Sequence, residues 1–150
     1  MIDPQKKTIK WGIIGAGRIA RTFATDLQYA AHATLQGIAS RQADPAKAFA
    51  GEFSVPNYYG SYAAMLADPA IDAVYIATPH SHHRDQSIAA LNAGKHVLCE
   101  KPATVTGAEL EDVITVAKQQ GRYFMEGMWT YFMPVIQKTK RWVEEGRIGQ

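Results

Sequence analysis

The sequence has 150 residues, of which 47% are apolar and 20% are charged, and its net charge is +2. These values are typical of one globular domain, and the near balance of charge predicts neither a nucleic-acid nor a membrane-surface partner. The single cysteine, Cys99, leaves no internal disulfide and no cysteine-based zinc site. No apolar run is long enough for a signal peptide or a membrane span, so we expect a cytoplasmic protein.

Segments with the apolar patterns of strands and helices alternate along the chain. Strands are predicted at residues 9–14, 35–39, 55–59, 72–77, 95–99 and 123–126. Helices are predicted at residues 18–31, 45–53, 62–67, 84–92, 106–120 and 134–144. This alternation predicts an α/β fold, a doubly wound parallel sheet built from right-handed βαβ units.

Several residues mark where the predicted helices begin and end. Asp44 followed by Pro45 is typical of an N-cap and a first helical position, and Ser61 is a second N-cap candidate. Gly94 and Gly121 are typical of the position just after a helix. Residues 1–150 are predicted to form one domain. Because residues 147–150 are typical of the approach to a further strand, we expect the sequence to be a piece of a longer protein.

A glycine-rich turn directly follows the first predicted strand. Gly15, Gly17 and Ala20 form a GxGxxA pattern, with Arg18 and Ile19 between them. The first glycine permits a tight turn, the second lets the backbone approach a pyrophosphate, and the small third residue lets helix and strand pack closely. The position within a βαβ unit favours a dinucleotide site over an ordinary strand-to-helix turn.

The end of the second predicted strand bears on which dinucleotide binds. An acidic residue there would bind the ribose 2′-hydroxyl of NAD, but the sequence reads Ala39, Ser40, Arg41. A hydroxyl followed by arginine suits a 2′-phosphate, since a guanidinium can stack on adenine and form two hydrogen bonds to phosphate. We therefore predict NADP in preference to NAD, although Arg41 would also suit a solvated surface.

Thr78 and Pro79 follow the fourth predicted strand, at the edge of the sheet where ligands bind. Three histidines come next, His80, His82 and His83, but no Cys, Asp or Glu completes a set of metal ligands at a matching spacing. We predict no metal site, and expect these side chains to cap helices or contact the cofactor.

Glu100 and Lys101 end the fifth predicted strand. A buried strand has little reason to finish in two charges, so either a site needs them or they form a surface ion pair. Trp129 and Tyr131 follow the sixth strand, where each could line a pocket or belong to the core.

Four stretches carry a family resemblance: Gly15–Ala20, Ala77–Pro79 with His83, Ala89–Pro102 and Met125–Trp129. Together they resemble the Gfo/Idh/MocA family of NAD(P)-dependent sugar and polyol oxidoreductases, over essentially the whole chain. The stretch Met125–Pro134 is similar to the dihydrodiol and xylose dehydrogenase members.

The resemblance implies that this chain is an N-terminal Rossmann domain whose enzyme transfers hydride between a nicotinamide and a sugar, polyol or dihydrodiol. Lys101 would hydrogen-bond the reacting hydroxyl, Glu100 would contact the nicotinamide ribose, and the Lys101–Pro102 bond would be cis. His83 matches a family histidine, whereas His80 stands where the family has asparagine. The implied cofactor contacts also include Ala77, Thr78, Pro79, His82, His83, Lys101 and Trp129.

The resemblance also implies a second, α+β domain that follows these residues and supplies the main acid/base, so the domain alone would bind cofactor without turning over. The full protein would be a homo-oligomer acting on a small molecule. Two other hypotheses stay open at this point. One is a non-catalytic dinucleotide-binding or sensor module, and the other is a Rossmann domain for a different nucleotide-like ligand such as a methyl donor.

Overall fold

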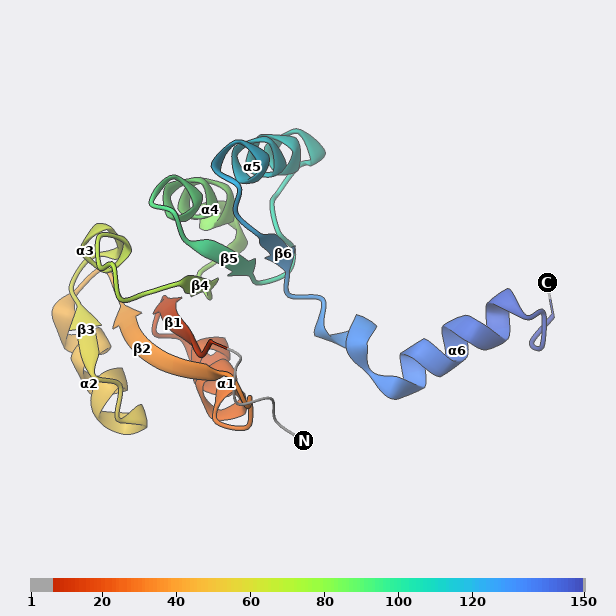
Figure 1. Cartoon of the computed structure of the whole chain (residues 1–150), viewed down its shortest axis with the longest axis horizontal. Helices are drawn as coiled ribbons and strands as arrows, with labels where there is room; N and C mark the ends of the chain where they lie inside the picture. Colours follow the sequence, from red (N-terminus) through yellow and green to blue (C-terminus); the bar gives the residue numbers. More distant parts are fainter. Residues whose placement is uncertain (1–6, 150) are drawn as a thin grey trace.

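The computed structural model describes residues 7–149, which form a six-stranded, all-parallel sheet with helices on both faces (Figure 1). The strand order is β3-β2-β1-β4-β5-β6. The strands are β1 (Ile9–Ile14), β2 (Ala33–Ala39), β3 (Asn57–Tyr59), β4 (Ala73–Ile76), β5 (His96–Cys99) and β6 (Phe124–Glu126). The doubly wound sheet predicted from the sequence is confirmed.

The helices that connect the strands are α1 (Arg18–Leu27), α2 (Ala43–Phe53), α3 (Tyr62–Leu66), α4 (His83–Asn92), α5 (Gly107–Gln120) and α6 (Pro134–Glu144). Two short 3₁₀ helices, η1 (His80–His82) and η2 (Trp129–Phe132), follow β4 and β6. Ser61 is an N-cap, as predicted, and Thr106, predicted to start a helix, is the N-cap of α5. Each side-chain oxygen accepts a backbone N–H at 3.2 Å.

The predicted end of the first helix and the predicted start of the second are wrong. The first helix ends at Leu27 rather than at residue 31, because the N–H groups of Tyr29 and Ala30 bond three residues back and close tight turns instead of continuing the helix. The second helix begins at Ala43 with Gln42 as its N-cap, so Asp44 lies in the first turn and is not the cap.

The two faces of the sheet bury different residues, because successive side chains of a strand point in opposite directions. Ile13, Ile38 and Tyr75 pack against α1 and α2, whereas Ile14 and Ile76 pack against α3, α4 and α5. Figure 1 shows α1 and α2 on one side of the sheet and α4 and α5 on the other. Strands covered on both sides explain why the central ones are almost continuously apolar.

Two glycines sit opposite each other in the middle of the sheet. Gly12 of β1 pairs with Gly37 of β2. A Cβ on Gly12 would lie 2.9 Å from the sulfur of Met65, and one on Gly37 would lie 3.1 Å from the Ile71 side chain. The space that side chains at these positions would need is therefore occupied by Met65 of α3, by Ile71 and by Tyr59 of β3.

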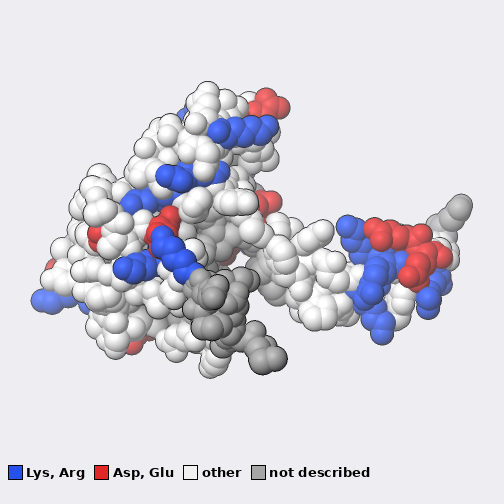
Figure 2. All heavy atoms as spheres, viewed as in Figure 1, with Lys and Arg blue, Asp and Glu red and all other residues white. Residues whose placement is uncertain are grey.

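Helix α6 extends away from the sheet beyond its β6 edge, on the side opposite to β3 (Figure 1). None of its residues is buried, although it carries apolar side chains such as Val135, Ile136 and Trp142. Figure 2 shows charges of both signs near the end of α6 and mainly uncharged side chains between this charged part and the body. Within residues 7–149, every helix is too short or too polar to cross a bilayer.

One partly buried pair makes the stability of the fold depend on pH. Tyr59 donates a 2.5 Å hydrogen bond to Asp68 Oδ2, while Asp68 Oδ1 accepts the Ala70 N–H. Burial, and then the contact with Asp68, raise the pKa of Tyr59 from 10.0 to about 12. The folded state therefore holds this proton more tightly than the unfolded chain, and the resulting stability is present below pH 10.0 and lost as pH rises towards about 12.

We expect the free energy of unfolding to be lower at about pH 11 than at about pH 8, and Tyr59→Phe to reduce that difference. Urea titrations of both proteins at the two pH values measure it. If the variant lost stability in alkali as steeply as the wild type, another group would be responsible.

Candidate functional site

After the two neighbouring central strands, β1 and β4, the chain crosses to opposite faces of the sheet. After β1 it enters α1 on one face of the sheet, and after β4 it enters α4 on the other face. A crevice therefore opens at the carboxyl ends of these neighbouring strands, which is where ligands bind in open α/β sheets.

The glycine turn lies in this crevice. Gly15 has a φ of +97°, and a Cβ there would lie 2.9 Å from the carbonyl oxygen of Ala77. Gly17 is the N-cap of α1 and has no atom within 4 Å of a Cβ built on it. Ala20 is fully buried, which lets α1 lie close to the sheet. The free N–H groups of the first helical turn thus face open space, and the turn fits the phosphates of a dinucleotide.

A cavity of about 350 Å³ joins this turn to the end of β2. Ser40 and Arg41 line it on one side, and His82 on the other. Ala77, Thr78 and Pro79 complete the predicted set around it. Tyr62 and Gln86 also line this cavity, and the sequence did not predict either, because each belongs to a helix whose apolar pattern indicates only the buried face.

The loops after β4 and β5 are tied together by buried contacts. His83 is 1% exposed, and its Nδ1 and Nε2 each lie 2.8 Å from a backbone oxygen, of Pro102 and Thr78 respectively. The Thr78 hydroxyl donates to Gln86 Oε1 at 2.5 Å. His83 is therefore placed beneath the crevice, where it fixes the two loops, while Thr78 stays at the surface of the cavity.

A second cavity, of about 470 Å³, lies on the other side of the start of α1. Arg18 and Ile19 line it from the helix, and Glu100 and Trp129 line it from the ends of β5 and β6. Trp129 is 63% exposed, and Tyr131 is also exposed, so neither belongs to the core. Since Gly17 lines the first cavity and Arg18 the second, the two adjoin at the glycine turn.

Glu100 and Lys101 do not pair in the way their adjacency suggests. The Glu100 carboxylate accepts the Tyr75 hydroxyl at 2.5 Å and the Lys101 backbone N–H at 3.1 Å. The Lys101 side chain is exposed, and no ion pair joins it to Glu100 among the described residues. The Lys101–Pro102 bond is cis, as predicted.

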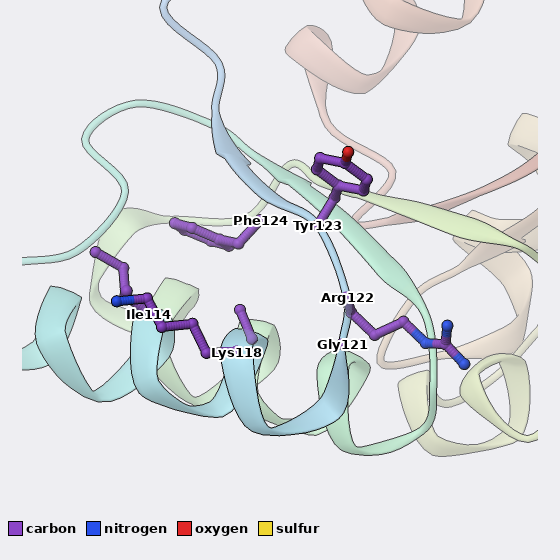
Figure 3. A pocket seen from close by; sticks show the side chains of 7 residues that line it. Ile114, Lys118, Gly121, Arg122, Tyr123 and Phe124 are labelled. Carbon is purple, nitrogen blue, oxygen red and sulfur yellow. The ribbon is translucent and has the colours of Figure 1, made fainter.

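A third hollow lies at the opposite end of the strands, between the second half of α5 and the start of β6 (Figure 3). Ile114 and Phe124 form its apolar part, and Lys118 and Arg122 supply its charge. It contains no carboxylate, histidine or cysteine, so it lacks the side chains that bind metal ions. In the part of the chain that the structure describes, no three His, Cys, Asp or Glu side chains are grouped for a metal ion.

The strand order, the glycine turn and the two adjoining cavities define a dinucleotide-binding Rossmann domain. Residues 9–128 match the oxidoreductase family with an NAD-binding Rossmann fold, Gfo/Idh/MocA. The chain belongs to this family, as the sequence resemblance predicted.

Named relatives are dehydrogenases. The chain is 38% identical over 143 residues to trans-1,2-dihydrobenzene-1,2-diol dehydrogenase of Mus musculus, covering 94% of the chain and 43% of the relative. It is 38% identical over 155 residues to the D-xylose 1-dehydrogenase (NADP(+)) of Hypocrea jecorina, covering 95% of the chain and 39% of the relative. The chain thus spans about two fifths of the length of these relatives.

Solved structures agree in fold. A 3-ketoreductase from Actinomadura kijaniata, in complex with TDP-benzene and NADP, is 32% identical with a TM-score of 0.90, over 96% of this chain and 46% of that one. A scyllo-inositol dehydrogenase from Lactobacillus casei, with NAD(H) and scyllo-inositol bound, is 34% identical with a TM-score of 0.86, over 96% and 43% of the two chains.

Proposed function

We propose that this chain is the cofactor-binding domain of an NADP-preferring dehydrogenase that acts on a hydroxyl or carbonyl group of a sugar, polyol or dihydrodiol. The observation that carries the proposal is the continuous crevice in which the glycine turn lies between Arg41 at one end and Glu100 at the other. That order matches a dinucleotide, whose adenosine and nicotinamide halves lie on either side of a pyrophosphate.

The adenosine half would lie in the cavity of Ser40 and Arg41. No acidic side chain stands at the end of β2 to bind a ribose 2′-hydroxyl, and the exposed Arg41 guanidinium is free to receive a 2′-phosphate. Relatives with solved structures hold either NADP or NAD(H), so the preference of this chain rests on these two residues.

The nicotinamide half would lie in the cavity of Glu100 and Trp129. The bound nicotinamide supplies the hydride-transfer chemistry. Lys101, exposed beside this cavity, would donate a hydrogen bond to the substrate oxygen and stabilise negative charge on it. Glu100 would accept a ribose hydroxyl, and Trp129 would shield one side from water. We propose that the remaining substrate contacts, the main acid/base and the oligomer contacts come from residues outside this chain.

The first test is a parallel titration of the chain with NADPH and NADH, followed by nicotinamide fluorescence. The proposal expects NADPH to bind at least tenfold more tightly, a difference of about 1.4 kcal/mol. Equal affinities would remove the NADP preference but leave a dehydrogenase domain, whereas binding of neither cofactor would contradict the proposed function.

Arg41→Ala tests the adenosine end by itself. The substitution removes the charged contact with the 2′-phosphate, which only NADPH has, and any stacking on adenine, which both cofactors have. We therefore expect NADPH to bind at least about tenfold more weakly and NADH to be affected much less. The same two titrations measure this. Arg122→Ala, which removes an arginine from the hollow in Figure 3, is the matched control and should leave both affinities unchanged.

A further inference from the structure

Tyr75 is an ionisable side chain in the middle of the sheet for which the proposed function gives no role. It lies in β4, is 3% exposed, and its hydroxyl donates a 2.5 Å hydrogen bond to Glu100 Oε1. Burial first, and then the hydrogen bond with Glu100, raise the pKa of Tyr75 far above its usual range. The hydroxyl therefore keeps its proton at neutral pH and acts as a hydrogen-bond donor to Glu100.

The ring that carries this hydroxyl is held by an aromatic stack. Tyr75 stacks on Phe23 of α1 with a centroid distance of 3.9 Å and an interplanar angle of 16°. Phe23 in turn meets Trp11 of β1 edge-on at 5.5 Å. Because α1, β1 and β4 all contribute to this stack, the donor has a fixed position in the wall of the second cavity, which Tyr75 and Phe23 both line.

Both oxygens of the Glu100 carboxylate accept hydrogen bonds. Oε1 accepts the Tyr75 hydroxyl, and Oε2 accepts the Lys101 backbone N–H. Glu100 is also close to Gly127 after β6, where a built Cβ would lie 3.7 Å from Oε1. The hydroxyl of Tyr75 is thus the one side-chain donor on Glu100 among the described residues, and it comes from a different strand.

We infer that Tyr75 is a positioning residue: it orients the Glu100 carboxylate, and through that carboxylate the Lys101 backbone, at the nicotinamide end of the crevice. This inference rests on the proposed function. Tyr75 itself is not a catalytic residue, since its hydroxyl is already committed to Glu100 and almost none of its surface is exposed. A carboxylate that is already fixed in position loses less conformational entropy when it binds a ribose hydroxyl, so the cofactor binds more tightly.

Tyr75→Phe tests the inference, because phenylalanine keeps the stack on Phe23 and removes only the hydroxyl. The wild type and the variant are each titrated with NADPH and with 2′,5′-ADP, which has the adenosine half but no nicotinamide half. We expect NADPH to bind about tenfold more weakly to the variant, and 2′,5′-ADP to bind within about twofold of the wild type. A general loosening of the fold would weaken both ligands.

A double-mutant cycle shows whether Tyr75 acts through Glu100. In a Glu100→Ala background, the further change Tyr75→Phe should have no effect on NADPH affinity. The matched control is Tyr59→Phe, which removes an identical tyrosine–carboxylate hydrogen bond, to Asp68, outside both cavities, and should leave both ligands unaffected.

The outcomes separate the two proposals. If the wild type binds neither ligand, the proposed function fails. If the wild type binds NADPH and Tyr75→Phe binds it equally well, or loses both ligands alike, the positioning role is overturned. If circular dichroism shows that Tyr75→Phe does not fold, Glu100→Gln replaces it: an amide offers one acceptor oxygen for two donors, so NADPH should again weaken selectively, and unchanged affinity overturns the inference.

Discussion

Adding one methyl group at Gly15 is expected to abolish NADPH binding and to lower the free energy of unfolding by about 1–3 kcal/mol. The φ of +97° is unfavourable for any residue with a Cβ, and that atom would lie 2.9 Å from the Ala77 carbonyl oxygen. To relieve the contact, β1 and β4 would have to separate where the phosphates are proposed to bind. Urea unfolding and NADPH titration of Gly15→Ala measure the two effects.

Gly17→Ala separates binding from folding. Gly17 has a negative φ and no atom within 4 Å of its built Cβ, so the free energy of unfolding should stay within about 0.5 kcal/mol of the wild type. The new methyl group would occupy the space of the phosphates, and NADPH binding should still be lost. Gly51→Ala in α2 is the control, with binding kept and stability equal or higher. NADPH binding by Gly17→Ala would place the phosphates elsewhere.

Lys101→Met is expected to remove turnover while leaving cofactor binding nearly intact. The methionine keeps the length of the side chain but cannot donate a hydrogen bond to the substrate oxygen. In a form of the protein that oxidises a sugar or polyol with NADP⁺, kcat should fall by about 10²–10³, the usual loss for one donor aimed at a developing negative charge. The affinity for NADPH should change by less than about twofold, since the Lys101 backbone contact with Glu100 remains.

The control for this variant is Lys118→Met, which removes another exposed lysine, from the hollow at the far end of the strands. It should leave kcat unchanged. A Lys101→Met protein with normal kcat would show that the ammonium group does not take part in the reaction. That result would favour the sensor hypothesis, under which the chain binds NADP(H) without catalysis.

The arrangement of strands and helices follows from the sequence because apolar periodicity and end signals act locally. Thr106 and Gly121, for example, both mark real ends of α5. The end of α1 could not be predicted in this way. Ala31 continues the helical spacing, but alanine buries so little surface that its presence does not show whether the helix still faces the core.

The site was only partly predictable for a different reason. Arg41 and the glycines lie close to one another in βαβ units, so sequence spacing alone brings them together. Glu100 and Lys101 are neighbours in sequence, but successive side chains of an extended chain point in opposite directions. The real partner of Glu100 is Tyr75, 25 residues earlier on the adjacent strand, and only the register of β4 and β5 reveals it.

The packing around Gly12 and Gly37 restricts how this sequence can diverge. A Cβ on Gly12 would lie 2.9 Å from the Met65 sulfur, so Gly12→Ala requires Met65 to shift or to be shortened. A Cβ on Gly37 would lie 3.0 Å from the Tyr59 ring and 3.1 Å from Ile71, so Gly37→Ala requires those two side chains to give way instead. Gly12 is therefore coupled to Met65, and Gly37 is coupled to Tyr59 and Ile71. Among descendants of this protein, substitutions there should arise in compensating combinations, whereas the exposed positions of α6 drift independently.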